Sequence, residues 1–273
     1  MKSLGTIIYV FCFCAVAQAD PLDILFPYEW HGNIDRIDFE EPSGVVFHEN
    51  RGTLFVVGDD GDLLEIRTDG TPVQQKHLRD ADLEGITYDP ATSLLYLAVE
   101  GEERILEVEP DDFSILREFT IPRRVNEKTM LKEGGQGIEA ITFVPKRDHP
   151  HGGTFYVTNQ SYDLSDQEDV SAIFEIEVPL RSTDASETVA RHIRQIVPMI
   201  PDMSGLNYSA TSNSLLVISD ATNCFFEISL SGKIKDAKAF PGQNQEGIAF
   251  DNKGNIYVVQ DSGGILKMRW KFE

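Results

Sequence analysis

A short pattern of apolar and polar positions recurs five times along the chain. In each copy, a small or acidic residue precedes Gly or Ala, an apolar residue follows, and an aromatic residue stands fifth. Every copy then runs into Asn, Asp, Gly or Pro, the residues that form turns. The pattern predicts five equivalent β-strands, which cover residues 43–47, 84–88, 139–143, 204–208 and 246–250.

Two more strands are predicted after each copy. The first is a nearly continuous run of β-branched, aliphatic and aromatic residues, typical of a strand that is buried on both faces. These runs cover residues 54–57, 95–98, 155–157, 215–218 and 256–259. The next strand repeats most regularly, with a charged residue in third place among apolar ones. It covers residues 63–66, 105–108, 173–176, 225–228 and 265–268.

A fourth, more polar strand completes four of the copies and fits an outer, half-exposed position. It is expected at residues 73–78, 114–121, 188–197 and 233–240. The fifth copy has no room for such a strand before Glu273, whereas residues 33–39 precede the first copy and contain Ile34, Ile37 and Phe39. We expect this N-terminal segment to join the last copy as its outer strand, because that closes the ring and removes an open sheet edge.

Repeated four-stranded units around a channel form a β-propeller. The sequence therefore predicts an all-β fold, a single β-propeller with five four-stranded blades that is closed by an N-terminal strand. Six blades are the alternative, if residues 122–137 and 177–202 contain further strands. Without a Gly/Ser-rich linker or a change in composition, residues 20–273 are expected to form one domain.

The first 19 residues have the pattern of a secretory signal peptide. Lys2 precedes an apolar run at residues 7–16, and Ala17-Gln18-Ala19 has the small residues of a cleavage site. The expected location is the periplasm, with an uncleaved inner-membrane anchor as the alternative. Cleavage would remove Cys12 and Cys14 and leave Cys224 alone, so no intrachain disulfide is expected.

The chain is strongly acidic, with a formal net charge of −21 that becomes −22 when Lys2 is removed with the leader. This charge disfavours nucleic acid and anionic lipid as partners. After cleavage of the signal peptide, no membrane insertion is expected. The acidity is explained either by a solvated surface or by a divalent cation site, which needs clustered oxygen ligands.

In an antiparallel hairpin, the start of the first strand lies beside the end of the second. The acidic and amide residues at those positions should therefore meet at one mouth of the channel. Several converging carboxylates repel one another, and Ca²⁺ would relieve the repulsion. The alternative is that they are caps and turn residues facing solvent. The predicted metal ligands are Glu84, Glu139, Glu246, Asp59, Glu100, Asn159, Gln160, Asp220 and Asp261, with Ser43 and Ser204 at the equivalent first-strand positions.

Two longer loops, residues 122–137 and 161–171, should reach the same mouth. The first is basic and the second acidic. They could form the rim of a ligand site, or they could pair with each other for structural reasons.

The motifs at residues 83–90, 202–206 and 245–251 resemble those of the SdiA-regulated (YjiK-like) family of secreted bacterial propellers. The resemblance spans about the whole mature chain, and it implies a periplasmic propeller with a metal in its channel. Related propellers include esterase-like phytases and calcium-dependent lactonases. The chain departs from both, since it has few Lys and Arg residues for a phosphate site and no His at the ring positions.

Two functions follow from these observations. The first is a calcium-binding periplasmic propeller that binds an unidentified small molecule or protein partner at its acidic mouth. The alternative is a Ca²⁺-dependent hydrolase of esters, lactones or phosphoesters, in which the ion would polarise an oxygen of the substrate. The first is preferred, because neither a catalytic base nor a nucleophile is evident in the sequence.

Overall fold

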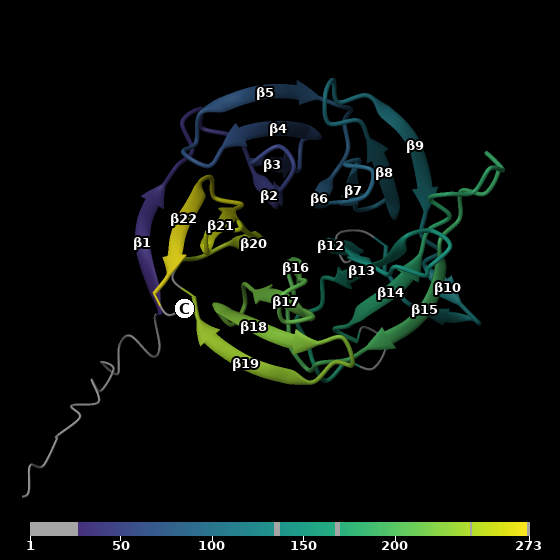
Figure 1. Cartoon of the computed structure of the whole chain (residues 1–273). Coiled ribbons are helices and arrows are strands. Elements are labelled where there is room, and N and C mark those ends of the chain that lie inside the picture. The colour runs from purple at the N-terminus through teal and green to yellow at the C-terminus, as the bar shows by residue number, and fades with distance from the viewer. Residues whose placement is uncertain (1–26, 134–136, 167–169, 241, 272–273) are drawn as a thin grey trace, which may run out of the picture.

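The computed structural model describes residues 27–133, 137–166, 170–240 and 242–271. These residues form five antiparallel sheets of four strands and one sheet of two strands. The five large sheets are arranged around a central axis as the blades of a propeller (Figure 1). The prediction of five blades is confirmed, and the six-blade alternative is wrong. The predicted signal peptide lies outside the described residues.

The blades follow one another along the chain, and each begins with its innermost strand. Blade 1 contains β2 (Pro42–His48), β3 (Thr53–Gly58), β4 (Asp62–Arg67) and β5 (Pro72–His77). Blade 2 contains β6 (Leu83–Tyr88), β7 (Leu95–Val99), β8 (Arg104–Val108) and β9 (Ile115–Thr120). Blade 3 contains β12 (Ile138–Pro145), β13 (Gly153–Asn159), β14 (Ile173–Glu177) and β15 (Arg191–Ile196).

The last two blades have the same order. Blade 4 contains β16 (Gly205–Ser209), β17 (Ser214–Ser219), β18 (Cys224–Ser229) and β19 (Ile234–Ala239). Blade 5 contains β20 (Gln245–Phe250), β21 (Asn255–Gln260), β22 (Ile265–Trp270) and, as its outer strand, β1 (Tyr28–Asn33). A small hairpin, β10 (Arg124–Val125) and β11 (Lys128–Thr129), lies between blades 2 and 3. No helix in the described ranges is both long and apolar enough to cross a membrane.

The ring is closed by an N-terminal strand, as predicted, but the prediction of residues 33–39 as that strand was wrong. The strand that pairs with β22 is β1, which ends at Asn33. Beyond it, the carboxylate of Asp35 accepts the backbone N–H groups of Ile37 (3.0 Å) and Phe39 (2.9 Å). These bonds form a local turn in place of a strand. The turn brings Phe39 into the core between blades 5 and 1.

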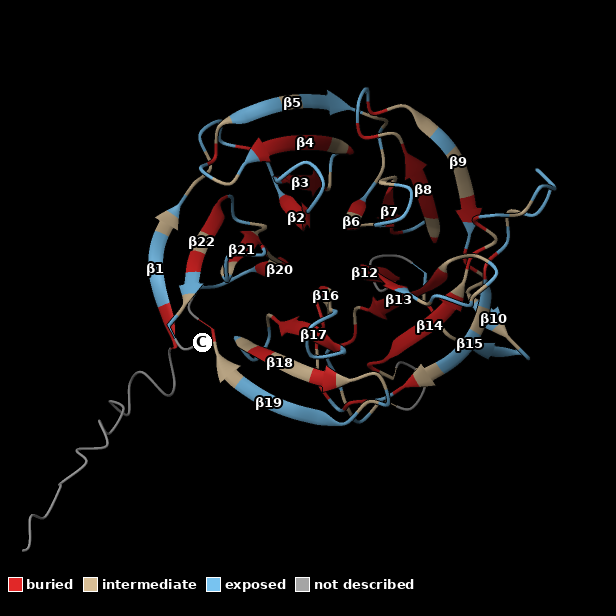
Figure 2. Ribbon diagram, viewed as in Figure 1, coloured by how far each residue is buried: buried red, intermediate tan, exposed pale blue. Residues whose placement is uncertain are grey.

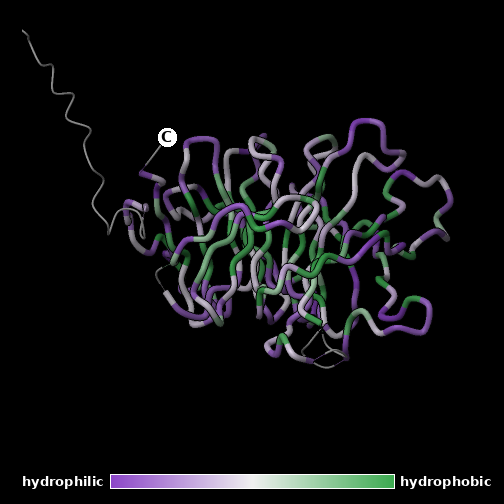
Figure 3. Tube along the Cα trace, turned by 90° about the horizontal axis from the view of Figure 1, so that it is seen from below, coloured by the Kyte–Doolittle hydropathy of each residue, from purple (hydrophilic) through white to green (hydrophobic). Residues whose placement is uncertain are grey.

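Burial decreases from the inner strands to the outer strand of each blade, which agrees with the sequence pattern (Figure 2). All six residues of β3 are buried, whereas five of the six residues of β5 are exposed and the sixth is half-exposed. Seen from the side, apolar residues form a band through the middle of the disc, and hydrophilic loops lie above and below it (Figure 3). The apolar side chains therefore pack between neighbouring blades, and the loops form the two faces.

The charged residue in the third strand of most blades has a structural role. Glu107 lies opposite Tyr96 across the strand pair, and it is 2 % exposed. Its carboxylate accepts the Tyr96 hydroxyl (3.0 Å) and two hydrogen bonds from Arg117 (2.6 and 2.7 Å). Bidentate hydrogen bonds from an arginine offset the free-energy cost of removing a carboxylate from water. Equivalent pairs hold Glu65 with Arg51, and Glu175 with Lys146 and Arg194.

The inner strands touch backbone to backbone at the axis. A Cβ atom on Gly44 would lie 2.9 Å from the Cα of Gly85, and one on Gly247 would lie 2.9 Å from the Cα of Gly44. One on Gly85 would lie 3.1 Å from the Cα of Ala140. At these positions, glycine is therefore required by the close approach of neighbouring backbones. The cavity inside the channel is only about 10 Å³, the room that one water molecule needs.

Substituting one of these glycines should therefore destabilise the whole ring. Gly247→Ala places a methyl group 2.7 Å from the backbone nitrogen of Val45, which cannot move without displacing β2. We expect a loss of about 1–3 kcal/mol, as for other overpacked cores, and a melting temperature lower by several degrees. Lys253→Ala, in the adjoining exposed turn, is the control. Equal melting temperatures for the two variants, measured by circular dichroism, would contradict the axial contact.

Candidate metal site at one mouth of the channel

An irregularity in strand pairing places acidic side chains at the mouth where the inner strands begin. In blade 2, Leu83 pairs with Val99 and Gly85 with Ala98, so Glu84 has no residue opposite it. Blade 5 leaves Glu246 unpaired in the same way, and blades 1 and 3 have the same shift. Such β-bulges turn a side chain out of the regular ladder. Both carboxylate residues line the channel cavity as a result.

A repeated backbone contact joins the two predicted residue sets. The N–H of Glu100, at the end of the second strand, donates to the carbonyl of Asp82, two residues before Glu84 (2.9 Å). Asp59 makes the equivalent bond to Glu41 (3.2 Å), and Asp261 makes it to Asn244 (3.0 Å). The predicted proximity of first-strand starts and second-strand ends is therefore a regular feature of the propeller.

The densest group of carboxylates lies between blades 1 and 2. Ligand oxygens of Asp59, Asp82 and Glu84 all lie within 4.8 Å of one another. The group continues around the mouth, because Glu139 acts electrostatically on Glu84, and Glu246 acts on Glu139. At least five acidic side chains from four blades thus form one electrostatic cluster.

Burial is the main cause of raised pKa values in this cluster, and neighbouring carboxylates add to it. The pKa of Glu84 and that of Glu139 are raised well above the ordinary value. The same causes raise the pKa of Glu246 to about 8, that of Glu100 to about 7 and that of Asp59 to about 6. The charged neighbours that mainly act on these five described groups are other carboxylates.

The acidic residues of the third strands provide a comparison, because they are buried carboxylates with a structural role. Burial alone would raise the pKa of Glu175, but hydrogen bonds from Lys146 and Arg194 lower it to about 2. The mouth carboxylates have no comparable cationic partner among the residues that act on them. Their arrangement is suited to an external cation.

The predicted ligands divide into two groups. Glu84, Glu139, Glu246, Asp59 and Glu100 belong to the cluster itself. Asp220 and Asp261 lie at the same mouth and act on Glu246, although the Asp220 carboxylate also accepts the N–H of Gln245 (2.8 Å).

The two amide residues of blade 3 differ from each other. Gln160 lies beside the cluster, with its Nε2 3.5 Å from Oε1 of Glu139. The side chain of Asn159 is engaged elsewhere. Its Oδ1 accepts the N–H of Ala172 (2.9 Å) and its Nδ2 donates to the carbonyl of Val170 (3.3 Å). Asn159 therefore holds the ends of the β13–β14 loop together.

The serines at the first-strand positions connect blades. The Ser43 hydroxyl donates to the backbone carbonyl of Leu83 in blade 2, and the Ser204 hydroxyl donates to that of Gln245 in blade 5. Where the repeat has Ser instead of Glu, the side chain thus bridges neighbouring inner strands.

Two acidic residues of the mouth were missed by the sequence analysis. Asp82 belongs to the densest group, and Asp202 contributes to the raised pKa values of both Glu139 and Glu246. Each stands two residues before the first residue of the repeat. Glu41 and Asn244 occupy the same position in blades 1 and 5. An extension of the repeat by two residues would have revealed this signal.

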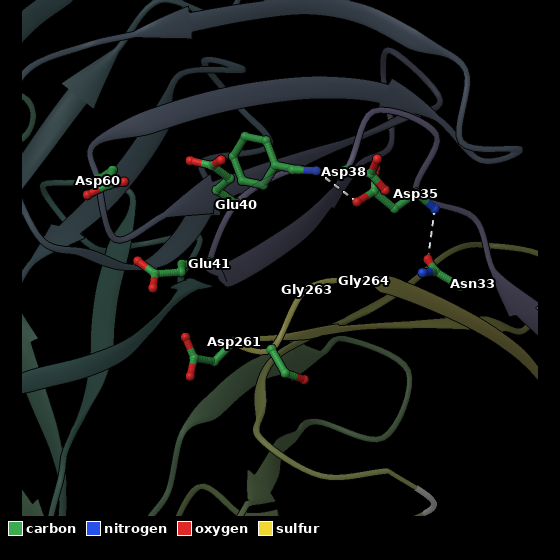
Figure 4. Close-up of a pocket in the computed structure, with 11 residues that line it drawn as sticks. Asn33, Asp35, Asp38, Glu40, Glu41, Asp60, Asp261, Gly263 and Gly264 are labelled. Atoms are coloured by element: carbon green, nitrogen blue, oxygen red, sulfur yellow. Dashed lines mark hydrogen bonds between the residues drawn. The ribbon is translucent and has the colours of Figure 1, made fainter.

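A pocket of about 700 Å³ opens beside the cluster, between blades 5 and 1. The side chains of Glu41, Asp60 and Asp261 gather on one side of it (Figure 4). Asn33 and Asp35, on the other side, are engaged in the turn that follows β1. The pocket is acidic and adjoins the group that contains Asp59.

The two long loops do contact each other, as the structural alternative proposed. Lys132 of the first loop forms an ion pair with Asp166 of the second (3.6 Å). Arg123 of the first loop pairs with the buried Glu103 (3.1 Å). In the second loop, the pKa of Tyr162 is raised, mainly by burial and to a smaller extent by the negative charges of Asp202 and Glu139. The phenol of Tyr162 is therefore close enough to the acidic cluster to interact with it electrostatically.

Comparison with known proteins identifies a family and a fold. The sequence model of the family described as SdiA-regulated matches residues 29–263. No curated protein matches the sequence. Glutaminyl cyclase from Myxococcus xanthus has a similar structure, with a TM-score of 0.58, 12 % sequence identity, and coverage of 87 % of this chain and 93 % of its own. A chain of a nidogen/laminin complex has a TM-score of 0.50, 17 % identity, and coverage of 83 % of this chain and 74 % of its own. At such identities, these similarities show the fold alone.

The raised pKa values predict how pH affects stability without metal. The folded-state pKa of Glu246 is about 8 against an ordinary value of 4.5, so its stabilising contribution is complete below 4.5 and is lost as pH rises through 8. In EDTA, we therefore expect the melting temperature of the wild type to fall between about pH 6.5 and 8.5. The measurement starts at 6.5 because histidines with an ordinary pKa have largely lost their proton above that pH.

Glu246→Gln should remove part of that fall. At the upper end of the window, the variant should melt a few degrees above the wild type, at roughly 2–4 °C per kcal/mol for a domain of this size. Glu29→Gln, on the exposed face of β1, should follow the wild type throughout. Parallel pH profiles for all three proteins would show that the Glu246 carboxylate is not destabilised in the fold.

Proposed function

The chain belongs to the SdiA-regulated family, and we propose that it is a periplasmic β-propeller that binds Ca²⁺ at its acidic mouth and a ligand or partner protein beside the ion. The single observation that carries this proposal is the cluster of buried carboxylates whose main charged neighbours are other carboxylates. The periplasmic location rests on the signal-peptide pattern of residues 1–19.

The spacing of the oxygens suits one calcium ion. Ca²⁺ lies about 2.3–2.6 Å from each ligand, so two oxygens on opposite sides of the ion are about 4.6–5.2 Å apart. Asp59, Asp82 and Glu84 have oxygens within 4.8 Å of one another. They would be the main ligands, and Glu139 would be the next carboxylate within the cluster.

The donor type favours calcium over other metals. The described acidic and amide side chains of this mouth offer oxygen atoms, whereas Zn²⁺ and copper sites use His and Cys. Mg²⁺ requires a stricter octahedral geometry and retains several waters. Carboxylates that come from different strands and loops are better suited to the variable geometry of Ca²⁺.

A ligand site beside the ion follows from its coordination number. Ca²⁺ takes six to eight oxygens, more than three monodentate carboxylates supply. The remaining positions are open to water or to an oxygen of a bound molecule. The adjoining pocket of about 700 Å³ provides room for that molecule.

One observation favours the hydrolase as a second candidate. The pKa of Glu246, raised to about 8, lies in the range of a general base that works near neutral pH. In that function the ion would polarise a carbonyl or phosphoryl oxygen, and Glu246 would accept a proton from water. Binding remains the preferred function, because burial and charge repulsion already account for this pKa.

Calcium should stabilise the protein against unfolding. At a concentration about 100 times the dissociation constant, a ligand of the folded state adds about 2.7 kcal/mol. At about 2–4 °C per kcal/mol, this corresponds to a rise in melting temperature of roughly 5–10 °C over EDTA. Glu84→Gln and Asp82→Asn should lose most of the rise, and Glu29→Gln should retain it. An unchanged melting temperature of the wild type in millimolar Ca²⁺ would reject the metal site.

A panel of aryl esters, lactones and phosphoesters separates the two functions. We expect no turnover that depends on Ca²⁺. Calcium-dependent hydrolysis that disappears in Glu246→Gln would establish the hydrolase instead, since that substitution leaves Asp59, Asp82 and Glu84 in place.

A further inference from the structure

A second cavity lies at the opposite mouth of the channel, where the inner strands end. Its volume is about 810 Å³, within the range of roughly 300–1,000 Å³ that small-molecule sites occupy. All five blades contribute an aromatic residue from the same position of the repeat. These residues are Phe47, Tyr88, Phe143, Tyr208 and Phe250.

The aromatic lining extends into a cleft between blades 4 and 5. Phe225 and Trp270 line this part of the cavity, together with Leu216. The ring of Phe225 lies 6.0 Å from that of Phe250, and Trp270 packs edge-on against Tyr28 at 5.3 Å. Because these rings are held by the blade core, the cavity is already formed without a ligand.

The cavity is separate from the acidic mouth. Between the two mouths, the inner strands enclose a cavity of only about 10 Å³, the room that one water molecule needs. The lining of the aromatic cavity shares no residue with the cluster of Asp59, Asp82 and Glu84, so the two are separate sites.

The charged residues that line the aromatic cavity are all acidic. They are Glu49, Glu227 and Asp251, and the described lining contains no Lys or Arg. Asp251 is engaged with Asn255 and Tyr257, and Glu227 has Lys235 at 3.4 Å. Glu49 lies on the exposed turn that follows β2. The surrounding potential favours a cation over an anion.

We propose that this aromatic cavity binds an organic cation with an apolar or aromatic body. Tyr88, Tyr208 and Trp270 are half-buried in this lining, and one face of Tyr88 stacks on His48 (4.4 Å between centroids). The π-electrons of these rings would attract a cation, and the apolar walls would bury the remainder of the molecule. Polar contacts are also present. The hydroxyls of Thr87 and Thr142 accept backbone N–H groups of the next blade and retain their own hydrogens for donation.

The test compares two dyes on the intact protein. Thioflavin T is an aromatic cation that fluoresces when it is immobilised, and anilinonaphthalene sulfonate is an aromatic anion. We expect saturable binding of thioflavin T at 150 mM salt and affinity at least about tenfold weaker for the anion, because charge and cation–π attraction both favour the cation. Equal affinity for the two dyes would overturn the proposal, since it would show an apolar site without charge preference.

Substitutions locate the dye. Tyr88→Leu and Trp270→Leu keep an apolar side chain but remove the π-face, and each should weaken thioflavin T binding about tenfold. Tyr162→Leu at the acidic mouth and Trp30→Leu on the exposed face of β1 are the matched controls and should bind as the wild type does. Normal affinity in both cavity variants would overturn the proposal. Glu49→Gln, an exposed substitution that should not affect folding, is expected to weaken binding about twofold to threefold through charge alone.

Calcium distinguishes this site from the proposed metal site. Saturating Ca²⁺ should leave the affinity for thioflavin T unchanged, because the aromatic cavity and the carboxylate cluster have no residue in common. Displacement of the dye by Ca²⁺, or loss of binding in Glu84→Gln, would place the dye at the acidic mouth and overturn the proposal. If calcium does not bind at all, the dye result is unaffected.

Discussion

The close approach of five inner strands at one axis is the constraint on which the rest of this structure depends. Gly44, Gly85 and Gly247 allow backbones of neighbouring blades to meet where a methyl group would already be too large. Just before Gly85 and Gly247, bulges take Glu84 and Glu246 out of the regular ladder, and both line the channel cavity. The same close packing leaves a cavity of only about 10 Å³ inside the channel. One structural requirement thus accounts for both the glycine repeat and the narrow channel.

The carboxylates of the protein fall into two populations that share burial and differ in their partners. In the third strands, Glu65, Glu107 and Glu175 each have an arginine, and they stabilise the blade as part of a hydrogen-bonded pair. At the mouth, the neighbours of Glu84 and Glu139 are further carboxylates. The mouth cluster differs from these structural acids in its lack of an arginine or lysine among the main charged neighbours of Glu84 and Glu139, and this difference is the basis of the proposed cation site.

The errors of the sequence analysis have local physical causes. Residues 33–39 have apolar residues at the spacing of a strand, but Asp35 bonds to two nearby N–H groups and forms a turn, so the closing strand is β1. The sequence also did not show that the amide of Asn159 holds the β13–β14 loop. Asp82 was missed because it precedes the strand itself. In residues 33–39, side-chain contacts over two to four residues compete with the periodic pattern, and periodicity does not reveal which of the two prevails.

The sequence by itself determined the five-bladed propeller, the order of strands in each blade, closure by the N-terminus and the mouth at which the acids meet. It could do so because strand alternation and the five-fold repeat are properties of the chain read in order. Only the tertiary structure decided which oxygens lie within 4.8 Å of one another and which acids have cationic partners. It also revealed the aromatic cavity at the other mouth. Those properties arise from residues of different blades, and their distances depend on how closely the blades pack.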